Sequence, residues 1–168
     1  ISGDGKTAII EMAAASGLPL VKLEELDLYK SSTYGTGELI LDAIDKGCSK
    51  IIMGIGGSAT NDGGTGMAKA LGVKFLDKDG NELPEGGKSL ATLAKIDMSN
   101  LDKRIANIDI QAACDVTNPI CGENGAAAIY GPQKGATKEM IKVLDAALSN
   151  FQKVVDSQLG KGISTLAG

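Results

Sequence analysis

The chain contains no histidine and no tryptophan among its 168 residues. Without histidine, Ser-His-Asp and Cys-His hydrolysis, histidine-ligated metals and acid–base catalysis by imidazole are excluded. Any general base must therefore be a carboxylate or a lysine. The three cysteines, Cys48, Cys114 and Cys121, form no Cys-x-x-Cys pair, so neither a disulfide framework nor a zinc site is expected. Reduced thiols favour a cytoplasmic protein.

Aromatic residues are also scarce, and no long basic run is present, which limits the kinds of partner that the chain can bind. The net charge is −4, and the aromatic residues are 3 tyrosines and 2 phenylalanines. Without a basic patch or stacking platforms, nucleic acid is not an expected partner. No apolar stretch approaches the length that spans a bilayer, so no membrane partner is expected either. The sequence leaves open whether the chain forms a homo-oligomer.

Apolar runs that alternate with helical patterns predict an α/β fold. With 43% hydrophobic residues, the chain can bury a real core. We expect a Rossmann-like, largely parallel or mixed sheet with flanking helices, and we treat residues 1–168 as a single α/β region. The expected strands are 6–12, 50–55, 73–76 with a hairpin turn at Asp79-Gly80, and 108–114; those at 50–55 and 108–114 should be buried. The expected helices are 38–46, a short one ending near residue 71, 89–94, and a long one from Thr137, a plausible N-cap, to Gly160.

The loop after the strand at 50–55 has the chemistry of an oxyanion cradle. Gly56 and Gly57 would let backbone N–H groups approach a ligand, with the hydroxyls of Ser58 and Thr60 beside them. Asn61-Asp62 inside the loop favours a metal–phosphate site, because a carboxylate beside phosphate needs Mg²⁺ or a proton between them. The alternative is that Asp62 only caps the following helix.

Two further polar clusters follow downstream. Asp115 and Asn118 come just after the strand at 108–114, where they would suit Mg²⁺ or a substrate hydroxyl, or form an Asx-turn before Pro119. Gln133-Lys134 lies between glycines, and the lysine would reach a phosphate as a point charge or lie in solvent.

Two Gly-Lys-Thr/Ser triplets invite a P-loop interpretation that the spacing rejects. They lie at residues 5–7 and 87–89. The Walker pattern requires an earlier glycine five positions upstream, which neither triplet has. A loose Gly-x-Gly-x-x-Ala match at residues 54–59 is too weak to indicate a dinucleotide site.

Four ordered motifs together resemble the bacterial glycerate kinase family. They are Thr-Tyr-Gly-Thr-Gly-Glu at 33–38, the glycine-rich loop at 54–64, Ala-Cys-Asp-Val-Thr-Asn-Pro at 113–119 and Gly-Pro-Gln-Lys-Gly-Ala at 131–136. The resemblance implies ATP- and Mg²⁺-dependent phosphorylation of the small molecule D-glycerate, commonly to 2-phosphoglycerate, on a layered two-domain α/β fold. It also implies that this chain is the central part of a longer two-domain kinase, and we expect it to be inactive alone.

On this interpretation, Asp62, Asp115 and Lys134 are the candidate catalytic residues. Asp62 or Asp115 would bind Mg²⁺ or act as base, and Lys134 would offset developing negative charge. The candidate substrate- and nucleotide-binding residues are Gly56, Gly57, Ser58, Thr60, Asn61, Asn118 and Gln133. The rival hypothesis is a non-catalytic fragment that binds an anion or a partner chain.

Overall fold

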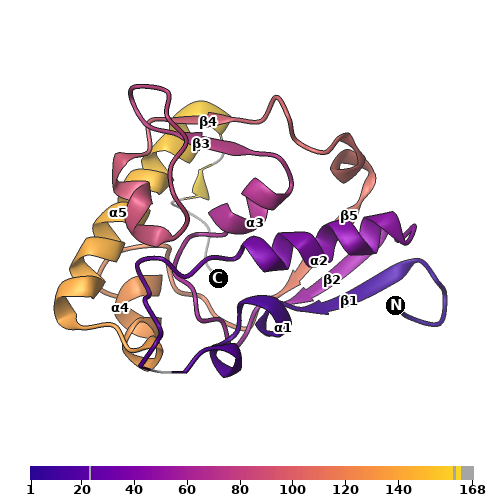
Figure 1. Ribbon diagram of the computed structural model, residues 1–168, viewed down its shortest axis with the longest axis horizontal. Helices are drawn as coiled ribbons and strands as arrows, with labels where there is room; N and C mark the ends of the chain where they lie inside the picture. The colour runs from indigo at the N-terminus through magenta and orange to yellow at the C-terminus, as the bar shows by residue number, and fades with distance from the viewer. Residues whose placement is uncertain (23, 161, 164–168) are drawn as a thin grey trace.

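Three parallel strands form the central sheet of the protein. The computed structural model describes residues 1–22, 24–160 and 162–163. Strands β1 (Thr7–Glu11), β2 (Lys50–Gly54) and β5 (Asp109–Ala113) pair in the order β1-β2-β5, and both pairings are parallel (Figure 1). The carboxyl ends of the three strands therefore meet at one edge of the sheet. The predicted α/β class with a largely parallel sheet is confirmed.

Helix α2 (Tyr34–Asp45) covers one face of this sheet (Figure 1). Alternate strand residues point to the same face, so Ile10 and Ile51 pack with Ile40 in one buried cluster. The helix begins four residues earlier than the predicted start at Glu38. Its first turn contains glycines that sequence propensity disfavours. A Cβ on Gly37 would lie 2.5 Å from the carbonyl oxygen of Met67, so close packing of α2 on α3 (Thr65–Ala70) requires this glycine.

The second face of the sheet is open in the described part of the chain. Ile9 is 63% exposed, and every residue of β5 is exposed. In β2, Ile51 and Met53 are buried while Ile52 is half-buried. The expectation of buried strands is therefore wrong for β5 and holds for only one face of β2. The reason is that β5 lies at the edge of the sheet. An apolar strand sequence indicates that another element should pack on the strand, but it does not identify that element.

A small antiparallel sheet forms a separate layer. Strand β3 (Lys74–Leu76) pairs with β4 (Lys95–Asp97). The predicted turn at Asp79-Gly80 forms and brings Glu82 back to pair antiparallel with Leu76 of β3. The expected hairpin is therefore present as a single bridge, and the longer pairing of β3 is with β4, further along the chain. A 3-10 helix, η2 (Gly87–Thr92), takes the place of the helix expected at 89–94.

Helix α5 (Lys138–Leu159) lies apart from the central sheet and packs against η2 (Figure 1). Thr137 caps its N-terminus as predicted, accepting a hydrogen bond from Met140 N at 3.2 Å. Cys48, Cys114 and Cys121 are free cysteines. No helix among the described residues is long and apolar enough to cross a membrane. The remaining elements are α1 (Ala13–Ser16), α4 (Ala126–Tyr130), η1 (Leu18–Leu20), η3 (Lys103–Asn107) and η4 (Pro132–Lys134).

Candidate functional site

The loop that follows β2 is held in place by the segment that follows β1. Leu18 N donates to Gly57 O at 2.9 Å, and Ala59 N donates to Ser16 O at 2.8 Å. These backbone bonds use the carbonyl of Gly57 and leave the glycine turn itself at the surface, where Gly56 and Gly57 are exposed. The loop is therefore a fixed platform at the carboxyl edge of the sheet.

A cavity of about 260 Å³, here called the loop cavity, lies against this platform. It brings together six of the residues predicted from sequence, which come from the loop after β2, the segment after β5 and the η4 turn. Ile55, Val116 and Tyr130 complete its walls. The six predicted residues are Gly56, Gly57, Ser58, Asp115, Gln133 and Lys134.

The two glycines of the platform differ in what a side chain would do there. Gly57 has φ +70°, a conformation that L-residues rarely adopt. Gly56 lies outside the positive-φ region, and a Cβ on it would meet no atom within 4 Å. A methyl group at Gly56 would consequently project into space that the folded protein does not use.

We predict that Gly56→Ala weakens binding of inorganic tripolyphosphate about tenfold, because the methyl group blocks the approach of the anion to the loop amides. Titration calorimetry measures the affinity, and thermal unfolding should be unchanged. Gly3→Ala is the matched control, since its Cβ also meets nothing within 4 Å and its φ is not positive. Wild-type affinity in Gly56→Ala would show that the anion does not approach this loop.

Lys134 is the buried cation of the loop cavity. Only 8% of the residue is exposed. Its Nζ donates to Ser58 Oγ and to the carbonyl oxygen of Thr60, both at 2.7 Å. Burial lowers the pKa of Lys134 from 10.5 to about 8, while the nearby charge of Asp62 acts in the opposite direction. Lys134 is therefore protonated near neutral pH. Its hydrogen bonds connect η4 to the glycine loop.

The pKa of Lys134 predicts how anion binding depends on pH. The affinity of the free protein for sulfate, whose charge is constant in this range, should fall as the pH rises through about 8. Lys134→Arg should move this decrease to much higher pH, because guanidinium does not deprotonate in proteins. An identical pH profile in both proteins would contradict the assignment.

The same pKa shift has a consequence for stability. The unfolded chain retains a proton on Lys134 between pH 8 and 10.5 that the folded protein has lost, so this group makes the unfolding free energy rise with pH in that window.

Asp62 lies beneath the platform and is almost fully buried, with 1% exposed. Its Oδ2 accepts from Thr33 N and Thr33 Oγ1, both at 2.8 Å, and from Gly66 N at 3.1 Å. Its Oδ1 accepts from Gly64 N at 3.2 Å. Thr33 Oγ1 in turn accepts from Met67 N, so the carboxylate ties the start of α2 to the start of α3. This geometry supports the capping alternative that the sequence left open.

Asp115, by contrast, is exposed and lines the loop cavity. No group of three or more histidine, cysteine, aspartate or glutamate side chains in the described residues could hold a metal ion on its own. Mg²⁺ is commonly held by one or two carboxylates together with substrate phosphates and water. A single carboxylate that lines the cavity beside the glycine loop fits that mode of binding.

The other predicted residues lie next to the loop cavity rather than in it. Thr60 contributes only its carbonyl oxygen, to Lys134. Asn118 accepts a hydrogen bond from Tyr130 Oη and donates to Asn124 O. Tyr130 was missed from the sequence, although it directly precedes the glycine–lysine motif. Its hydrogen bond to Asn118 depends on the tertiary structure, and the spacing of the two residues in the sequence does not predict it.

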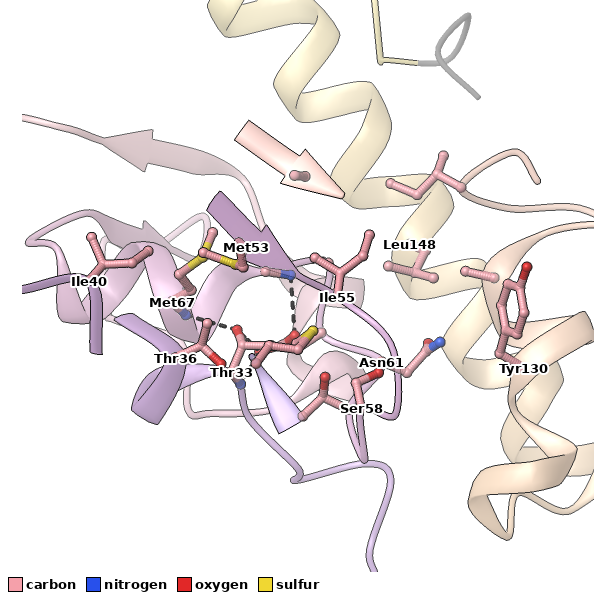
Figure 2. Close-up of a pocket in the computed structure, with 18 of the residues that line it drawn as sticks. Thr33, Thr36, Ile40, Met53, Ile55, Ser58, Asn61, Met67, Tyr130 and Leu148 are labelled. Atoms are coloured by element: carbon pink, nitrogen blue, oxygen red, sulfur yellow. Dashed lines mark hydrogen bonds between the residues drawn. The ribbon is translucent and has the colours of Figure 1, made fainter. Parts of the chain in front are cut away.

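A second cavity of about 440 Å³, here called the apolar cavity, adjoins the first. Methionine, isoleucine, leucine and alanine side chains form most of its wall (Figure 2). Asn61 and Asp62 line it as well. The two cavities share four lining residues, Ile55, Ser58, Tyr130 and Lys134.

The fold and the site together define an α/β protein with a glycine loop and a buried lysine beside a cavity at the carboxyl ends of parallel strands. The chain belongs to the glycerate kinase family, since the family model for glycerate kinases matches residues 1–168. The predicted family resemblance is thereby confirmed.

Curated relatives and a solved structure agree with this assignment. The chain is 53% identical to glycerate kinase of Halalkalibacterium halodurans and 55% identical to glycerate 2-kinase of Escherichia coli, in each case over 100% of the chain and 44% of the relative. It is also similar to the crystal structure of a glycerate kinase 2 from Salmonella typhimurium LT2, with a TM-score of 0.97, 53% identity, and coverage of 100% of this chain and 46% of that one. The chain therefore spans less than half the length of these relatives.

Proposed function

We propose that the chain carries the phosphate-binding part of an enzyme that transfers the γ-phosphoryl group of ATP to D-glycerate with the help of Mg²⁺. The observation that carries this proposal is the Lys134 ammonium, held 2.7 Å from Ser58 Oγ at the end of the glycine loop. Family membership supports the choice of glycerate as acceptor. The E. coli relative is named glycerate 2-kinase, which supports 2-phosphoglycerate as the product. The cytoplasm is the compartment that we propose for this chemistry.

Phosphoryl transfer depends mainly on positioning and electrostatic stabilisation, so it does not require a histidine. The loop amides at Gly56 and Gly57 would donate to phosphate oxygens, and Ser58 would add a hydroxyl donor. The Lys134 charge would stabilise the negative charge that accumulates on the transferred group. Gln133, on the same wall, has an amide that would orient a substrate or phosphate oxygen.

Of the two candidate acids, we assign Mg²⁺ binding to Asp115. Its carboxylate is exposed in the loop cavity, whereas the oxygens of Asp62 already accept hydrogen bonds from the backbone and from Thr33. When bound, Mg²⁺ would neutralise charge on the phosphates. Asp62 would act by holding the loop that bears Ser58 and Thr60.

The proposal is tested with a protein of the relatives' full length that carries this chain, called the full-length protein below. It should release ADP from ATP only when D-glycerate and Mg²⁺ are both present, and ³¹P NMR of the product should show 2-phosphoglycerate. Asp115→Asn should raise the Mg²⁺ concentration needed for half-maximal rate about tenfold or more.

Two results would contradict this proposal. Absence of glycerate-dependent ADP release from a folded full-length protein would overturn the kinase assignment. Formation of 3-phosphoglycerate alone would overturn the position of transfer. The chain of residues 1–168 assayed by itself should bind sulfate without turnover, and glycerate-dependent ADP release by this chain alone would contradict the expectation that it is inactive.

A further inference from the structure

One buried polar atom in the apolar cavity lacks a partner. Asn61 is 7% exposed, and its Oδ1 has no hydrogen-bond partner within the described part of the chain. Leaving a buried acceptor unsatisfied is energetically costly, so such groups usually serve a ligand or a specific role. Asn61 is among the residues that line the apolar cavity (Figure 2).

The wall around Asn61 suits a flat, apolar group. Met12, Met53 and Met67 line the apolar cavity together with Ile40, Leu71 and Leu148. Methionine thioethers adapt their shape and make favourable contacts with aromatic rings. D-Glycerate, a small polar anion, would lose its hydration against this apolar wall. A heteroaromatic base with one amino donor would bury its faces against the wall and satisfy Asn61.

The position of the apolar cavity relative to the loop cavity suits a nucleotide that spans both. Ser58 and Lys134 line both cavities. They are the two polar side chains that the proposed function places beside the phosphate. A ligand with a planar base in one cavity can therefore place its phosphates in the other.

We propose that the apolar cavity binds the adenine base of the nucleotide and that Asn61 Oδ1 accepts a hydrogen bond from its exocyclic amino group. This inference rests on the proposed function, which requires a nucleotide phosphate in the loop cavity. Asn61 thereby selects for a base that carries an amino donor, since a base without one leaves the buried acceptor unsatisfied.

The test compares two nucleotides with the full-length protein. ATP and purine riboside 5′-triphosphate have the same phosphates, sugar and ring system and differ only in the exocyclic amino group. Titration calorimetry should show that wild-type protein binds ATP about tenfold more tightly. Asn61→Leu, which has a similar shape and no acceptor, should bind both with equal affinity. Asn61→Asp, which keeps an acceptor oxygen, should retain the preference for ATP.

Binding of inorganic tripolyphosphate separates this inference from the proposed function. The Asn61 variants should bind it like the wild type, because it occupies only the loop cavity. Equal affinity of wild-type protein for the two nucleotides overturns the adenine assignment, whether or not the variants fold. If tripolyphosphate still binds in that case, the phosphate site stands and only the base site is wrong. If neither nucleotide nor tripolyphosphate binds, both proposals fail.

Discussion

Lys134→Met should lower kcat/KM for D-glycerate phosphorylation by the full-length protein about 100-fold, a loss of about 2.7 kcal/mol in transition-state stabilisation. Methionine keeps the buried stem of the side chain but removes the charge that Ser58 Oγ and the carbonyl of Thr60 hold in place. Steady-state kinetics at pH 7 measures the effect. Because the variant no longer buries a charged group, its unfolding free energy should fall by less than the loss in transition-state stabilisation.

Two variants control this experiment. Lys138→Met removes an exposed lysine from the first turn of α5, only four positions along the chain, and should leave kcat/KM within twofold. Lys134→Arg keeps the charge in a different shape and should recover only part of the activity. Retention of more than a third of the wild-type kcat/KM by Lys134→Met would assign this lysine to structure alone.

Asp62→Ala should lower the free energy of unfolding by about 3–5 kcal/mol. The substitution leaves three backbone N–H groups and the hydroxyl of Thr33 without their acceptor, at a position with 1% exposure. Chemical denaturation of the full-length protein measures the loss. Asp115→Ala is the matched control: it removes an exposed carboxylate and should change stability by less than about 0.5 kcal/mol.

Asp62→Asn tests whether Asp62 stabilises the loop through hydrogen bonds or binds the metal. One amide oxygen can still accept the bonds made by Oδ2, but the amide nitrogen would face Gly64 N, so stability should fall by about 1–2 kcal/mol. The Mg²⁺ requirement of the reaction should stay unchanged. If stability is kept while the Mg²⁺ requirement rises, Asp62 binds the metal, as one of the sequence hypotheses has it.

Local patterns predicted the elements whose signals lie within a few residues of each other. The helix behind Thr137 and the strands at β1 and β2 follow from capping and apolar patterning, which act over one or two turns. The early start of α2 and the pairing of β3 with β4 were missed, because each depends on a neighbour distant in sequence. Cover on β5 was also predicted wrongly, since apolar composition does not identify what packs on a strand.

The sequence by itself determined the chemistry of the site: glycines, hydroxyls, carboxylates, amides and a lysine in ordered motifs, with histidine excluded. Only the tertiary structure decided how these residues divide their work. It placed Asp115 and Lys134 in the loop cavity, turned Asp62 towards Thr33 and the start of α3, and left the Oδ1 of Asn61 without a partner among the described residues. The physical reason is that hydrogen bonding and burial depend on packing between segments far apart in the chain, which residue type and spacing do not encode.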